Sequence, residues 1–272
     1  MIDRNVYMIS DGTALTVESL GSSLLTQFEQ VNFNTFVFPF IDSMEKAENV
    51  CNKISQDYAN SHVKPLVFMT LVDPKISDLI RNTNACVFDF FESFLIKIEE
   101  ELQVNASDIA GRAHGVSSKE KYNLRIDAVN YALAFDDGMK LEGYNIADII
   151  LIGVSRCGKT PSCLYMALQF GVFAANYPLT DDVLTDCILP EVLRPYKHKL
   201  FGLTIDPQRL SNIREERRPN TQYSSLLQCR REVNDVEKMY KYERIPYINS
   251  TTFSIEEIAT KIMSLAQLKR KI

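Results

Sequence analysis

The sequence predicts an α/β protein with two lobes, each a parallel sheet with crossover helices. Strand-length apolar runs alternate with amphipathic helical segments along most of the 272 residues, and that alternation is typical of parallel sheets. A glycine-containing stretch at residues 153–160 separates a buried strand from a helix, which indicates a loop at the edge of the second sheet. With 46% hydrophobic and 24% charged residues, the composition is that of an ordinary globular protein.

The first lobe is expected at residues 1–104, where apolar runs of strand length are separated by helical patterns. The predicted strands are residues 6–9, 35–40 and 66–72. The predicted helices begin near residues 17, 43 and 91. Two of them show apolar residues at helical spacing, namely Val17, Leu20, Leu24 and Phe28 in the first helix and Phe91, Phe94, Leu95, Ile98 and Leu102 in the last.

The sequence shows no clear apolar periodicity from about residue 103 to residue 122, so residues 105–146 are expected to connect the lobes. His114 lies in this stretch, where a surface or packing role explains a lone histidine better than catalysis does. A helix is predicted at 123–135, with Ile126, Val129 and Leu133 on one side. It ends at the turn Asp136-Asp137-Gly138, where glycine can supply a positive φ.

The second lobe is expected at residues 147–272 and repeats the alternation of strands and helices. The predicted strands are residues 147–154, 174–177, 200–205 and 248–249, and the predicted helices are residues 160–170, 209–217 and 232–242. A final amphipathic helix follows Ser254, which stands three residues before Glu257 in the spacing of a capping box.

Charge and apolar run length argue against nucleic-acid and membrane partners. The chain has 30 Lys and Arg against 35 Asp and Glu, a net charge of −5, whereas proteins that coat nucleic acid are usually basic. No apolar run approaches the roughly 20 residues of a membrane span, and the start lacks a signal-peptide core, so a cytoplasmic protein is expected. Six cysteines without a CxxC pair and only three histidines argue for free buried thiols rather than a zinc site.

The strongest motif is GVSRCGKT at residues 153–160, which satisfies G-x-x-x-x-G-K-[ST] between a buried strand and a helix. Its glycines allow the backbone to wrap a phosphate, and the amide hydrogens at the helix N-terminus attract the anion. The predicted nucleotide-binding residues are Gly153, Val154, Ser155, Arg156, Cys157, Gly158, Lys159 and Thr160. Lys159 can approach the terminal phosphates, and the Thr160 hydroxyl can bind Mg²⁺. The alternative is a glycine-rich turn with a solvated lysine.

Several carboxylates are candidates for metal binding or for accepting a proton. Asp136 and Asp137 oppose the dipole at a helix C-terminus, which hints at function, although a solvated turn explains them equally well. Asp11 follows the first strand at an edge where α/β proteins bind ligands, with a helix cap as the alternative. Asp73 and Asp206 each end a strand and precede proline, so either could hold a metal or serve as a turn residue.

Arginines cluster within an otherwise acidic chain. The cluster can be a solvated helix face whose positive charge is partly offset by neighbouring glutamates. It can also be a surface that binds a phosphoprotein or a nucleotide phosphate. Its members are Arg209, Arg214, Arg217, Arg218, Arg230 and Arg231.

Taken in order, the motifs resemble the phosphoenolpyruvate synthase regulatory proteins, which belong with the pyruvate, phosphate dikinase regulatory proteins. The resemblance runs from about Val6 to Ile262 and is carried by GVSRCGKTP together with the helix RIDAVNYALAFDDG. The opening SDGTALT and the tract RRPNTQYSSLLQCRREV favour the synthase branch. This combination is more specific than the 153–160 loop alone.

The resemblance implies a bifunctional enzyme whose protein substrate is phosphoenolpyruvate synthase. It implies inactivation by phosphoryl transfer from ADP to a threonine, and reactivation by inorganic phosphate with release of pyrophosphate. Mg²⁺ is the expected cofactor, and the oligomeric state, a homodimer among the options, is left open. Lys159 and Arg125 are candidates for neutralising charge on the moving phosphoryl group, and Asp137, Asp136 or Asp11 for positioning the hydroxyl.

Two other functions are compatible with the residues. The 153–160 loop alone would suggest a P-loop kinase for a small molecule or a nucleoside triphosphate hydrolase. A non-catalytic nucleotide-sensing protein that binds and blocks the synthase is the third alternative.

Overall fold

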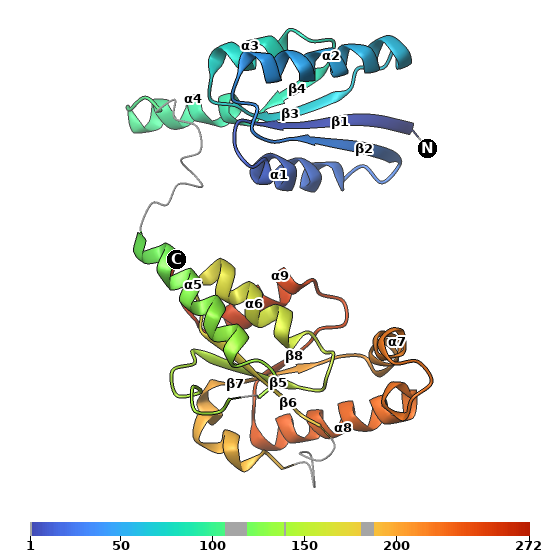
Figure 1. Cartoon of the computed structure of the whole chain (residues 1–272), viewed down its shortest axis with the longest axis vertical. Helices are drawn as coiled ribbons and strands as arrows, with labels where there is room; N and C mark the ends of the chain where they lie inside the picture. The colour runs from blue at the N-terminus through green and yellow to red at the C-terminus, as the bar shows by residue number, and fades with distance from the viewer. Residues whose placement is uncertain (1, 107–118, 139, 181–187) are drawn as a thin grey trace. The chain divides into compact units, whose positions relative to one another are not determined.

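The computed structural model describes residues 2–106, 119–138, 140–180 and 188–272. The chain divides into two compact units, Met1–Gly115 and Val116–Ile272, and each is described by itself (Figure 1). The helix expected at 123–135 belongs to the second unit, so the segment expected to connect the lobes is shared between them. His114 and Cys187 lie outside the described residues.

The first unit is a parallel sheet in the order β2-β1-β3-β4. Helix α1 lies on one face of this sheet and α2 and α3 on the other (Figure 1). The elements in chain order are β1 (Ile2–Ser10), α1 (Leu15–Leu25), β2 (Val31–Phe38), α2 (Met44–Ser61), β3 (Leu66–Thr70), α3 (Pro74–Arg81), β4 (Cys86–Asp89) and α4 (Phe90–Leu102).

Strand β1 forms the centre of the first unit because both of its faces are apolar. Successive side chains of a strand point to opposite faces. Tyr7 and Ile9 therefore join the cluster under α2 and α3, whereas Val6 and Met8 join the cluster under α1. This burial on both faces, with helices as crossovers, is the arrangement that parallel sheets require.

The second unit contains another parallel sheet, in the order β6-β5-β7-β8. Helices α5, α6 and α9 lie on one face and α8 on the other (Figure 1). The elements in chain order are α5 (Lys119–Ala134), β5 (Ile149–Gly153), α6 (Lys159–Phe170), β6 (Ala174–Pro178), η3 (Glu191–Lys199), β7 (Leu200–Thr204), α7 (Pro207–Arg217), η4 (Gln222–Ser224), α8 (Leu226–Glu243), β8 (Tyr247–Asn249) and α9 (Ile255–Leu265).

The central strands of the second sheet, β5 and β7, are buried along their whole length. Tyr240 of α8 contacts both strands, because its hydroxyl donates to the main-chain oxygens of Ile152 and Leu203 at 2.9 and 3.2 Å. The chain leaves β5 toward β6 on one side, while β7 lies on the other. The sheet therefore has a topological switch point at the carboxyl end of β5, which is where open α/β sheets bind ligands.

The predicted α/β class with two parallel sheets is confirmed, and the predicted strands and helices are present with shifted ends. The predicted capping box at Ser254 and Glu257 also forms. Four elements were not predicted, α3, β4 and the 3₁₀ helices η3 and η4. They are short or carry an internal proline, and so they lack the long periodic pattern on which such predictions depend.

The periodic faces predicted for two helices differ from the buried ones. In α5 the buried residues are Ala128, Tyr131 and Ala132, whereas Ile126 and Leu133 are exposed. Helix α4 has no buried residue at all, and Phe94, Ile98 and Leu102 are exposed. Apolar spacing identifies a helix, but the contacts of the fold decide which side is covered.

The remaining expectations concern membranes, cysteines and zinc. No described helix is both long enough and apolar enough to cross a membrane. The five cysteines that the structure describes are free, as predicted, but only Cys157, Cys163 and Cys229 are buried, so the prediction of buried thiols is wrong for the half-buried Cys51 and the exposed Cys86. Within the described ranges, no group of three or more His, Cys, Asp or Glu side chains is arranged to hold a metal ion.

Candidate functional site

The candidate site is the loop of residues 153–160, which joins β5 to α6 at the switch point of the second sheet. Helix α6 begins at Lys159, so the main-chain N–H groups of its first turn face this edge of the sheet. Such a helix N-terminus carries partial positive charge and attracts anions. The local fold therefore supplies the loop, the strand and the helix that the motif requires.

Two glycines of the loop are required for different reasons. A Cβ on Gly153 would lie 2.5 Å from the main-chain oxygen of Leu203 and 2.9 Å from Cys157 Sγ, so no larger residue fits. Gly158 has open space around its Cα but a φ of +99°, which L-residues rarely adopt. The loop depends on close backbone approach at one end and on a left-handed turn at the other.

Replacing Gly153 with alanine is expected to lower the free energy of unfolding by about 1–3 kcal/mol, because the new methyl group collides with the main chain of β7. Urea unfolding followed by circular dichroism measures this change. A variant that unfolds at the wild-type urea concentration would show that β5 and β7 can separate to admit the methyl group, contrary to this interpretation.

Lys159 is a buried cation whose partners are main-chain oxygens. Its side chain is 4% exposed, and Nζ donates to the carbonyls of Gly153 and Val154, each at 3.0 Å. None of the ion pairs found among the described residues involves Lys159. A buried charge without a counterion is costly. Its position in the loop is therefore that of a cation prepared for an anionic ligand.

The turn Asp136-Asp137-Gly138 meets the loop at Thr160. Thr160 Oγ1 donates to Asp136 Oδ1 at 2.8 Å, and the buried Asn176 of β6 donates to the same carboxylate oxygen. Asn176 also accepts from the main-chain N–H groups of Asp137 and Gly138, both at 3.1 Å. Asn176 thus attaches the end of α5 to β6 and holds one of the two predicted carboxylates against the loop.

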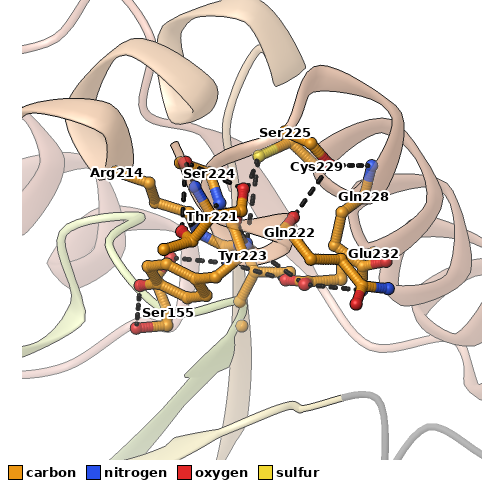
Figure 2. A network of polar contacts seen from close by, with 12 residues as sticks. Ser155, Arg214, Thr221, Gln222, Tyr223, Ser224, Ser225, Gln228, Cys229 and Glu232 are labelled. Carbon is orange, nitrogen blue, oxygen red and sulfur yellow. Dashed lines mark hydrogen bonds and ion pairs between the residues drawn. The ribbon is translucent and has the colours of Figure 1, made fainter. Parts of the chain in front are cut away.

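Ser155 is held from the other side of the loop by the hairpin of α7, η4 and α8 (Figure 2). Arg214 Nη2 donates to the Ser155 main-chain oxygen at 3.2 Å, and the Tyr223 hydroxyl donates to Ser155 Oγ at 3.1 Å. The guanidinium group also stacks on the Tyr223 ring, 4.1 Å from its centroid. A cavity of about 320 Å³ lies here, lined by Ser155, Leu179, Thr180, Arg214, Gln222, Tyr223, Gln228 and Glu232.

Arg214 and Glu232 form a buried, two-pronged ion pair. Nη1 and Nη2 donate to the two carboxylate oxygens at 3.1 and 2.6 Å, and Arg214 is fully buried. Burial alone would lower the Arg214 pKa, but the hydrogen bonds and charge of Glu232 outweigh it and raise the pKa, so the guanidinium stays charged. Removing one partner of such a pair usually costs about 3–5 kcal/mol, because the other charge is left buried. Arg214 therefore belongs to the interior rather than to the surface patch in which the sequence placed it.

The other loop residues have structural or exposed positions. Val154 and Cys157 are buried, and burial raises the pKa of the Cys157 thiol, so the thiol is a poor nucleophile. The Cys157 main-chain oxygen accepts from Ser250 Oγ at 2.9 Å, which ties the loop to the end of β8. Arg156 is exposed and has a φ of +77°.

The remaining candidates do not contact the loop through any interaction recorded for the described residues. Arg125 is exposed on α5, about 14 Å along the helix axis from Ala134, the last residue of the helix, at 1.5 Å per residue. Asp11 belongs to the first unit, where its carboxylate accepts from the Val72 N–H at 2.9 Å and burial raises its pKa. Their catalytic roles stay predictions. Asp73 and Asp206 are the N-caps of α3 and α7, in agreement with the turn interpretation.

Sequence reasoning missed three residues that hold the site, Asn176, Tyr223 and Glu232. Asn176 offered a signal, because asparagine is depleted in strands and a buried one needs partners. Tyr223 and Glu232 offered none, since each acts on a loop residue or an arginine distant in the sequence.

Comparison with known proteins identifies the family to which the chain belongs. The chain matches the family described as kinase/pyrophosphorylase over residues 6–263. A protein of Legionella pneumophila (strain Corby) is 58% identical over 269 residues, which cover 99% of both chains, and is named "Putative phosphoenolpyruvate synthase regulatory protein". Proteins of Hahella chejuensis (strain KCTC 2396) and Pseudomonas fluorescens (strain Pf0-1) bear the same name, at 50% and 48% identity over 99% and 98% of each chain. Matches of this length and identity show that the protein, with its 153–160 loop at the switch point of the second sheet, belongs to the kinase/pyrophosphorylase family.

Proposed function

We propose that this protein regulates phosphoenolpyruvate synthase by reversible phosphorylation of a threonine, with ADP as the phosphoryl donor and inorganic phosphate as the acceptor in the reverse direction. The family description and the names of the relatives support a phosphotransferase that acts on this enzyme. The observation that carries the proposal is the buried ammonium group of Lys159 within the 153–160 loop, whose recorded partners among the described residues are two main-chain carbonyls.

In this proposal the 153–160 loop is a P-loop that binds two linked phosphoryl groups. Main-chain N–H groups of the loop and of the first turn of α6 are suited to bind phosphate oxygens. Lys159 exchanges one or both of its carbonyl partners for a phosphate oxygen. The same cradle suits ADP in one direction, and phosphate followed by pyrophosphate in the other, because each presents one or two phosphoryl groups.

The forward step breaks the P–O bond between the two phosphoryl groups of ADP and forms a bond from phosphorus to the threonine oxygen. AMP leaves, and the hydroxyl proton passes to a carboxylate. Asp136 is the best-placed base, because its carboxylate already lies beside the loop at Thr160. In the reverse step an oxygen of inorganic phosphate attacks the phosphothreonine phosphorus. Pyrophosphate forms, and the threonine oxygen leaves as a hydroxyl after taking up a proton.

The residues present fit a Mg²⁺ ion that is shared with the phosphates. Thr160 Oγ1 and the Asp136 carboxylate are adjacent oxygen donors at the start of α6. Mg²⁺ is usually held by one or two carboxylates, the substrate phosphates and water, so a larger protein cage is not needed. When bound, the ion would neutralise charge on the phosphates.

Mass spectrometry of phosphoenolpyruvate synthase tests the proposal. After incubation with the protein, ADP and Mg²⁺, the synthase should carry one phosphoryl group on a threonine and should lose activity. Adding inorganic phosphate should then remove the group and release pyrophosphate. Inhibition that is reversed by dilution and leaves the synthase unmodified would instead indicate a non-catalytic inhibitor. Rapid turnover of ATP or GTP without the synthase would indicate a small-molecule kinase or a nucleotide hydrolase.

A further inference from the structure

We propose that Arg214 is a positioning residue that fixes the peptide group between Ser155 and Arg156 for binding of the anion. This inference rests on the proposed function of the loop. It assigns a task to a buried side chain on α7, 59 residues away from its contact in the loop.

The contact of Arg214 is with the main chain of the loop. Its Nη2 donates to the Ser155 carbonyl oxygen at 3.2 Å. Because a peptide group is planar and trans, its C=O and N–H point in opposite directions. Holding the Ser155 oxygen toward Arg214 therefore directs the Arg156 N–H away from Arg214. Arg156 has the left-handed conformation found in loops that gather successive N–H groups around an anion.

The position of Arg214 is itself fixed by several partners. Glu232 binds both terminal nitrogens of the guanidinium group, the Tyr223 carbonyl accepts from Nη1 at 3.0 Å, and the Tyr223 ring lies against it (Figure 2). The side chain is fully buried, so few other rotamers are available to it. A donor held in this way keeps the loop in its binding conformation before a ligand arrives, and such preorganisation is a large part of catalysis by fixed dipoles.

A lysine cannot replace this arginine. The planar fork of arginine binds Glu232 with two nitrogens while one of them also reaches Ser155. Lysine carries a compact ammonium on a shorter reach, so it can neutralise Glu232 without also holding the loop. The Arg214→Lys variant therefore removes the positioning contact while keeping the buried charge balanced.

The test measures binding of inorganic pyrophosphate and of ADP by titration calorimetry, together with steady-state kinetics on the synthase. Arg214→Lys should weaken pyrophosphate binding by about tenfold or more, in line with the effects of displaced binding groups. The KM for ADP should rise by a similar factor, and the KM for the synthase should stay within about twofold, since Arg214 acts on the phosphate side of the site. A variant that only destabilised the fold would not raise the KM for ADP while leaving the KM for the synthase unchanged.

Two further variants keep the inference open to refutation. The double variant Arg214→Met with Glu232→Leu removes both charges, as apolar replacement of a buried pair is often tolerated, and should lose pyrophosphate affinity as Arg214→Lys does. Arg81→Lys is the matched control, because Arg81 pairs with Asp89 and Glu92 in the first unit and should bind pyrophosphate as wild type. Wild-type affinity in folded Arg214 variants would overturn the positioning role alone. Absence of pyrophosphate and ADP binding by the wild-type protein would overturn both this inference and the proposed function.

Discussion

Replacing Lys159 with alanine is expected to slow ADP-dependent phosphorylation of the synthase by at least about a hundredfold, as the loss of a preorganised charge-stabilising donor does elsewhere. The wild-type ammonium group is buried in the loop, and its recorded partners in the described part of the chain are main-chain oxygens. Its charge is therefore available to stabilise the phosphoryl group during its transfer. Phosphate incorporation into the synthase, measured with radiolabelled ADP, checks the prediction.

The fold should survive this substitution, because a buried ammonium group without a counterion contributes little stability of its own. Lys199→Ala is the matched control, since Lys199 Nζ also donates to two main-chain oxygens, those of Asn145 and Tyr144 at 2.6 and 3.5 Å. Both variants lose a lysine that ties loop carbonyls together, but only Lys159 lies at the switch point. Normal phosphorylation by Lys159→Ala would show that the loop is not the phosphoryl-binding element, and an equal loss in Lys199→Ala would show that the effect is structural.

The alternation of strands and helices was predictable because a parallel sheet imposes it on the sequence locally. Strand β5 is buried on both faces and reads as an unbroken apolar run, and the capping box of α9 is complete within four residues. The four-residue strand β4 and the eight-residue helix α3 were missed, since segments so short carry little periodic signal. The covered side of α5 was also missed, because it is decided by packing on α6 rather than by the sequence of α5 itself.

The site was predictable only where it is contiguous in the sequence. The residues of the 153–160 loop stand together, so a motif identifies them all. The contact from Thr160 to Asp136 spans 24 residues, and the contact from Arg214 to Ser155 spans 59. Both depend on which strands are neighbours, which a single sequence does not determine. For the same reason Arg214 looked like a surface arginine, although its partner Glu232 lies on the next long helix.

The sequence left Asp136, Asp137 and Asp11 as alternative candidates for positioning the threonine hydroxyl, and the contact with Thr160 favours Asp136. Asp136→Asn should lower kcat by about 10²–10⁴-fold, the usual contribution of a general base. Asparagine keeps the shape and an oxygen that can accept from Thr160 and Asn176, so the turn should keep its structure. Steady-state kinetics with the synthase and ADP measure the change.

Asp137 is exposed with a φ of +48°, which asparagine tolerates, so Asp137→Asn should lower kcat by less than about tenfold.

The Mg²⁺ dependence separates the two tasks that Asp136 could have. If its carboxylate accepts the hydroxyl proton, Asp136→Asn lowers kcat by a similar factor at every Mg²⁺ concentration, because added metal does not replace the base. If the carboxylate chiefly holds Mg²⁺, the variant needs a higher Mg²⁺ concentration for half its maximal rate. Asp206→Asn is the control at the same edge of the sheet, since asparagine caps α7 as well as aspartate does. A larger loss in Asp137→Asn than in Asp136→Asn would transfer the role to Asp137, and the hydrogen bond to Thr160 would then only position the loop.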